Sequence, residues 1–161
     1  MGCKKTQFFY TPFLNKELID MKRIMSIAAV AALICSCVPK EKTVDFPTVD
    51  AVGSTSVIIE KVEMTKEHTA LHVRAYNNPG WWIKIVSETF IQADGKKYEM
   101  TGAEGIEPDV ELWMPEDGDS LFVLKFEPLP MKTKSFDFIE GYEERAFRLL
   151  GLNLEGKVRT A

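Results

Sequence analysis

The chain has 161 residues, of which 45% are hydrophobic and 27% are charged, and its formal net charge is −4. An acidic chain without a basic stripe gives no reason to expect binding to nucleic acid, and we predict no nucleic-acid partner. Its length and hydrophobic content are sufficient for one folded domain without disulfide bonds.

Residues 1–36 are predicted to be an export signal. A basic pair, Lys22 and Arg23, precedes the apolar run Ile24–Ile34. This run is too short for a membrane-spanning helix, which needs about 20 apolar residues. It has the proportions of a cleaved signal peptide when translation starts at Met21, which is therefore the expected start.

The end of this signal, Ile34-Cys35-Ser36-Cys37, resembles the lipobox of bacterial lipoproteins. The resemblance implies that Cys37 receives a lipid, which anchors the chain to a membrane. Cys3 and Cys35 would then be removed with the signal, so the processed chain would have no free thiol. The expected location is the cell envelope of a Gram-negative bacterium, at the periplasmic or surface face of the outer membrane. An ordinary secretory signal and a C-x-C redox pair are the alternatives.

Residues 37–54 are expected to be the lipidated cysteine and a flexible tether. The segment contains two prolines, a glycine and mixed charges, with weak periodicity. Fully extended, it would reach about 55 to 60 Å.

Residues 55–161 are expected to form an all-β domain. Hydrophobic alternation predicts about eight short strands, within residues 54–64, 69–77, 81–94 (one long or two short), 96–102, 112–114, 120–130, 134–141 and 146–156. Asp94 and Gly95 predict a hairpin turn, because both residues suit a positive φ. The pattern indicates an immunoglobulin-like, two-sheet antiparallel sandwich of about seven to eight strands. One turn of helix near Glu143 is the only helical alternative.

Aromatic residues alternate along the strongest strands. Phe122, Leu124 and Phe126 fall on one face of their strand, and Phe136 and Phe138 alternate likewise. Such stripes are typical of a sandwich interior, so we expect core packing and no cofactor.

The stretch NNPGWWIKI contains the candidate binding residues. Adjacent tryptophans on a strand point to opposite faces, so Trp81 and Trp82 cannot both face the core of one sheet. An exposed indole beside Tyr76 and Asn78 could stack on a sugar ring or anchor a partner protein. The favoured interpretation is structural, with both indoles buried between sheet and loop and Trp113 helping to cover them.

Two patterns of metal-ligating residues are incomplete. His68 and His72 are four residues apart but have no third ligand at a fixed spacing. Glu116, Asp117 and Asp119 resemble part of a calcium loop without its full spacing. We therefore expect no metal site, and a solvated position for both histidines.

Four stretches, YNNPGWWIKI, ADGKKYEMTGAEGI, WMPEDGDSLFVLKFEPLP and SFDFIEG with AFRLLGLNL, resemble the N-terminal region of bacterial thiol-disulfide oxidoreductase lipoproteins of the TlpA-like kind. The resemblance covers residues 57–156. It implies a β-sandwich module that follows a lipid anchor and precedes a thioredoxin-like domain. The C-x-x-C of that domain is absent from this sequence, so no catalytic residue is carried over. The chain would be a short paralogue or a fragment of a longer reading frame.

These observations predict a lipid-anchored, non-enzymatic β-sandwich that serves as a binding or spacer module. The first alternative is an accessory module that docks onto a thioredoxin-like partner. The second is a carbohydrate-binding module that uses an exposed tryptophan to hold a glycan.

Overall fold

The computed structural model describes residues 41–141 and 146–156, and all regular structure within them is β-strand. In chain order the strands are β1 (Lys42–Asp45), β2 (Ala51–Val52), β3 (Val57–Met64), β4 (Thr69–Tyr76), β5 (Trp82–Ile83), β6 (Phe90–Ala93), β7 (Lys96–Glu104), β8 (Leu112–Trp113), β9 (Asp119–Phe126), β10 (Ser135–Ile139) and β11 (Arg148–Asn153). The expected all-β class is confirmed. The export signal, Cys37 and the helical turn expected near Glu143 lie outside the described residues.

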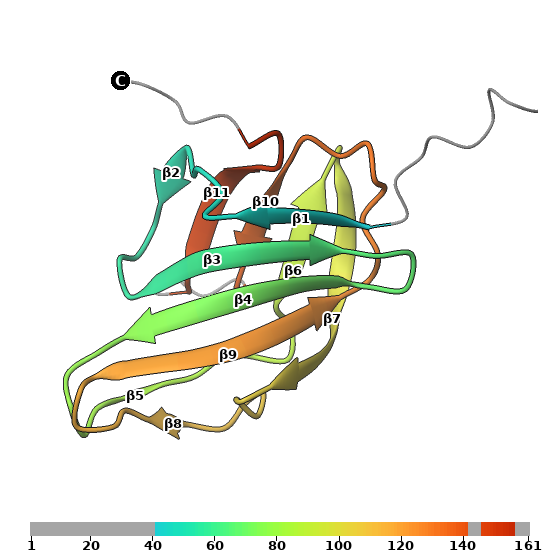
Figure 1. Cartoon of the computed structure of the whole chain (residues 1–161). Coiled ribbons are helices and arrows are strands. Elements are labelled where there is room, and N and C mark those ends of the chain that lie inside the picture. The colour runs from blue at the N-terminus through green and yellow to red at the C-terminus, as the bar shows by residue number, and fades with distance from the viewer. Residues whose placement is uncertain (1–40, 142–145, 157–161) are drawn as a thin grey trace, which may run out of the picture. The chain divides into compact units, whose positions relative to one another are not determined.

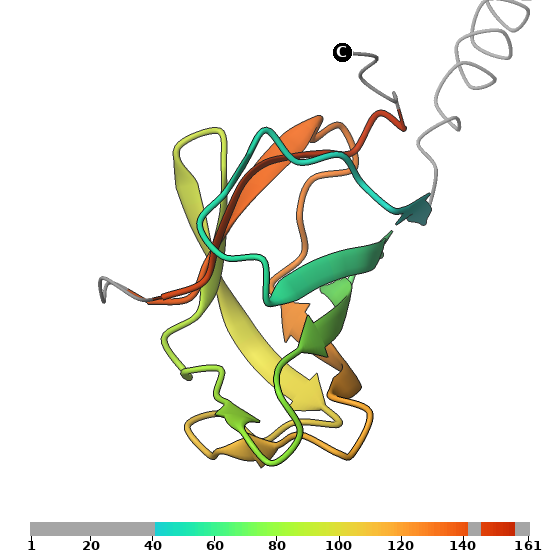
Figure 2. The same cartoon turned by 90° about the vertical axis from the view of Figure 1, so that its left-hand side faces the viewer.

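Nine of the strands form one continuous antiparallel sheet in the order β1-β3-β4-β9-β7-β6-β10-β11-β2. The sheet curls into two layers because β7 belongs to both (Figures 1 and 2). Its first part, Lys96–Glu99, pairs with β6, and its second part, Met100–Glu104, pairs with β9. The two layers of this sandwich-like fold are therefore halves of one sheet, whereas two separate sheets were expected.

The hairpin between β6 and β7 has the predicted geometry. Ala93 pairs with Lys96 across the turn. Asp94 and Gly95 both have positive φ, at 49° and 74°. This combination is the one required by a two-residue turn that matches the twist of the flanking strands.

The core lies between the two layers, on the faces that the alternation predicts. Phe122, Leu124 and Phe126 are buried on β9, and Phe136 and Phe138 are buried on β10. The rings of Phe126 and Phe138 meet edge to face, with centroids 6.4 Å apart and an interplanar angle of 88°. This contact joins one layer directly to the other.

The tether expected at 37–54 differs from the structure in its described part, because two segments of it belong to the sheet. Lys42–Asp45 pairs with β3, and Ala51–Val52 pairs with β11. This one segment therefore supplies both edge strands of the nine-stranded sheet, and edge strands this short leave little backbone free for pairing with another chain. Val44, which is buried between two exposed neighbours, is the only sign of the strand in the sequence.

The strands of the β1-β3-β4-β9 layer define two ends of the domain. At one end, Lys42 at the start of β1 pairs with Met64, the last residue of β3. At the other end, Tyr76 closes β4, and the chain then turns back into the short strand β5, which lies with β8 below β9 in the view of Figure 1. The eight residues of β4 cover about 23 Å between these ends.

The described part of the chain contains no helix that is long and apolar enough to cross a membrane.

Candidate functional site

The candidate site is built on the small second sheet, in which Trp82 of β5 pairs directly with Trp113 of β8. The backbone N–H of Met114 donates to the carbonyl of Trp81 at 2.8 Å, so Trp82 and Trp113 form a non-hydrogen-bonded pair. Side chains of such pairs lie closest together across a ladder. We call this two-stranded sheet, with the adjoining Trp81, the tryptophan ribbon.

The tryptophan ribbon is held in place by a tight turn. The N–H of Trp81 donates to the carbonyl of Asn78 at 2.9 Å, and Gly80 has a φ of 74°. Pro79 followed by a glycine with positive φ is the signature of a type II turn. The Asn77 side chain then donates from Nδ2 to the carbonyl of Trp82 at 3.0 Å. The sequence NNPGWW therefore encodes both the turn and its attachment.

All three tryptophans are exposed, so the interpretation that Trp81 and Trp82 are buried is wrong. The exposed fractions are 61% for Trp81, 45% for Trp82 and 60% for Trp113. Ile83 of the ribbon and the adjoining Met114 are the buried side chains here, and the indoles stay outside the core. Exposure on this scale is unusual for tryptophan, which makes these three residues the candidate for an interaction surface.

The other two candidate residues lie beside the ribbon. Tyr76 is 42% exposed at the end of β4, and Asn78 is exposed in the turn. The Asn78 N–H donates to Oδ1 of Asn77, so Asn78 also helps to hold the turn in place. The structure therefore brings Tyr76, Asn78, Trp81 and Trp82 to one end of the domain. It adds Trp113, which the sequence suggested only as a cover.

A groove of about 490 Å³ runs along one side of the ribbon. Its lining combines one indole and one partly buried phenyl ring with polar side chains, and includes Ser56, Trp82, Lys84, Ser87, Asp109 and Phe147. A mixed lining of this kind suits a ligand that needs both an apolar contact and hydrogen bonds.

Asp109 is fixed within this groove by the chain opposite. The Ser87 N–H donates to Oδ1 of Asp109 at 2.9 Å, and the Asp109 N–H donates to the carbonyl of Ile85 at 2.8 Å. The hydrogen bond from the Ser87 side chain, followed by that from its backbone, lowers the pKa of Asp109. Asp109 is therefore an ionised carboxylate over most of the pH range.

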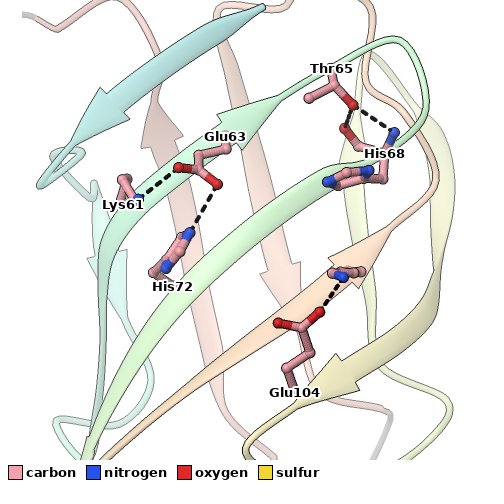
Figure 3. A network of polar contacts seen from close by, with 7 residues as sticks. Lys61, Glu63, Thr65, His68, His72 and Glu104 are labelled. Atoms are coloured by element: carbon pink, nitrogen blue, oxygen red, sulfur yellow. Dashed lines mark hydrogen bonds and ion pairs between the residues drawn. The ribbon is translucent and has the colours of Figure 1, made fainter.

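The histidines and the acidic turn do not form a site. His68 lies in the turn closed by Thr65, and His72 lies on the outer face of β4, where its Nε2 is 3.1 Å from Glu63 (Figure 3). Asp119 pairs with Arg74, and Asp117 accepts the N–H of Asp119. Within the described ranges, 41–141 and 146–156, no three metal-ligating side chains are grouped closely enough to hold an ion.

A pKa prediction follows from the network in Figure 3, in which Lys61 and His72 flank Glu63 at 2.6 and 3.1 Å. The hydrogen bond from Lys61, followed by that from His72, lowers the pKa of Glu63 below its ordinary 4.5. The contacts of ionised Glu63 therefore stabilise the folded protein fully above pH 4.5. This contribution is lost as the pH falls through the lower pKa that Glu63 has in the folded state. Lys61→Met should raise this pKa, measured by carbon-13 NMR titration of the carboxyl group.

The matched control is Lys97→Met, because Lys97 pairs with Glu99 and not with Glu63. It should leave the Glu63 titration unchanged. An unchanged Glu63 titration in Lys61→Met would contradict the assignment of Lys61 as the main cause.

No family model, no curated protein and no solved structure matches the chain.

Proposed function

We propose that this chain is a lipid-anchored lipoprotein of the Gram-negative cell envelope, whose β-domain is a non-catalytic binding module. The observation that carries the binding role is the exposure of Trp81, Trp82 and Trp113 at one end of the domain. The lipobox-like sequence ending at Cys37 supports the anchor.

The corrected tether changes how such an anchor would hold the domain. Only five peptide units separate Cys37 from Lys42, where β1 begins. Fully extended, they span at most about 18 Å. The start of β1 would therefore lie close to the bilayer.

The anchor is tested by labelling cells with a palmitate analogue and measuring the intact mass of the protein purified from membranes. We expect labelled protein that begins at an acylated Cys37, and no label in a Cys37→Ala variant. Cys35→Ala is the matched control, because it should leave labelling unchanged. Equal labelling of wild type and Cys37→Ala, or no label in either, would contradict the anchor.

A further inference from the structure

We propose that the tryptophan ribbon binds a cationic segment of another protein, rich in arginine or lysine. This inference rests on the proposed binding role and names the chemistry of its ligand. It is drawn from two independent features of the same end of the domain. One is the exposed indole surface, and the other is the unbalanced charge around it.

The indoles provide the apolar part of the surface. Trp82 and Trp113 share one face of the ribbon as a directly opposed pair, whereas Trp81 belongs to the neighbouring position of the strand. Each is at least 45% exposed. A guanidinium or ammonium group is attracted to the face of an indole, and tryptophan is the best of the aromatic side chains for this contact.

The charge around the indoles is almost entirely negative. Residues 77–88 and 105–118, which carry the ribbon and its loops, contain six carboxylates and one lysine, Lys84. The six are Glu88, Glu107, Asp109, Glu111, Glu116 and Asp117, and all of them are exposed.

These carboxylates are not neutralised by close cations, although Lys84 attracts Asp109 from a longer distance. In the part of the chain that the structure describes, none of the six forms an ion pair. The carboxylates on the outer face of the sheet differ, since Glu60 and Asp119 share Arg74, Glu63 contacts Lys61, and Glu104 pairs with Lys125. Negative charge is therefore neutralised on the sheet and left unbalanced at the ribbon.

This combination selects among the possible ligands. A neutral glycan could stack on the indoles and donate hydroxyl hydrogen bonds to the carboxylates, but it would gain no attraction from their net charge. An anionic ligand would be repelled by them. An arginine-bearing or lysine-bearing segment gains from both features, through cation–π contacts with the indoles and charge-assisted hydrogen bonds to the carboxylates. Tryptophan and arginine are also the residues that most often dominate protein interfaces.

The test measures binding of dye-labelled pentaarginine to the full-length chain in a nonionic detergent by fluorescence anisotropy. We expect saturable binding at low salt that weakens strongly at 0.5 M NaCl, because charged contacts are screened there. The double variant Trp82→Ala with Trp113→Ala should weaken binding about tenfold. The triple variant Glu111→Gln, Glu116→Gln, Asp117→Asn should weaken it by a similar factor, about tenfold.

Two matched controls separate this surface from general charge and general aromatic exposure. Phe46→Ala removes a side chain that is 69% exposed but lies outside the ribbon. The triple variant Glu41→Gln, Glu67→Gln, Asp94→Asn removes three exposed carboxylates in other loops. Both should bind pentaarginine as the wild type does.

Three outcomes would overturn the inference. The first is pentaarginine binding that weakens in both carboxylate triple variants but is unchanged in the Trp82→Ala, Trp113→Ala variant. Such binding would be nonspecific attraction between charges. The second is no binding of pentaarginine at all. The third is binding of an uncharged oligosaccharide such as chitotetraose, without pentaarginine binding, that is lost in the tryptophan double variant. That third result would remove the cationic ligand and leave the proposed binding role standing, whereas absence of any ribbon-dependent ligand would remove both.

Discussion

Replacement of Phe126 by alanine is expected to lower the free energy of unfolding by about 3 to 5 kcal/mol, the range for large aromatic residues truncated in a packed core. Phe126 has no exposed surface, and its ring meets Phe138 of the opposite layer edge to face. Its loss removes apolar burial, leaves a cavity and breaks a direct contact between the layers. The measurement is the urea unfolding curve at neutral pH.

Leu121→Ala is the matched control, because Leu121 lies on the same strand but is 56% exposed on the other face. Its expected effect is within about 0.5 kcal/mol. If Phe126→Ala does not fold, Phe126→Leu should still show a measurable but smaller loss. Equal losses for Leu121→Ala and the Phe126 variants would mean that β9 does not present Phe126 to the core.

The strands that could be predicted are those long enough to show alternation. β3, β4 and β9 have eight residues each, and their buried positions repeat almost every second residue. A strand of two residues has no period of its own, so β2 was not predicted, whereas β5 and β8 were expected within 81–94 and 112–114 but without their pairing. β1 was missed for a similar reason, since Val44 is its only buried residue.

The exposure of the tryptophans could not be predicted, although the alternation was correct. Opposite orientations for Trp81 and Trp82 follow from strand geometry alone. Whether an outward side chain is then covered depends on which segment packs over it. Here β8 pairs beside β5 and presents Trp113 outward as well, so the expected cover became part of the exposed surface.

The sequence shows that carboxylates are frequent near the candidate site, but it does not show which of them form ion pairs. Asp119 and Asp117 belong to one acidic turn, yet only Asp119 contacts Arg74. That difference is set by the register of β4 against β9, which places Tyr76 opposite Asp119 and Arg74 two residues away on the same face. Register is a property of the paired strands, and a single segment does not specify it.

Replacement of Gly118 by alanine is expected to cost about 3 kcal/mol or more of stability and to weaken binding at the tryptophan ribbon. Gly118 has a φ of 69°, and an added Cβ would lie 2.3 Å from the carbonyl oxygen of Asn77. The left-handed conformation alone costs an alanine about 1 to 2 kcal/mol. Relief of the clash would also disturb the hydrogen bond that the Asn77 N–H donates to the carbonyl of Gly118.

Gly80→Ala is the control that isolates the clash from the backbone conformation. Gly80 has a similar φ of 74° in the turn before β5, but nothing lies within 4 Å of an added Cβ. It should therefore lose only the conformational part, about 1 to 2 kcal/mol. Because the Asn77 side chain also holds the carbonyl of Trp82, Gly118→Ala should in addition weaken pentaarginine binding, whereas Phe126→Ala should not at temperatures where it is folded. Urea unfolding and fluorescence anisotropy on the same samples measure both effects. Equal stability losses for the two glycine variants would show that the turn before β9 can shift away from Asn77 without cost.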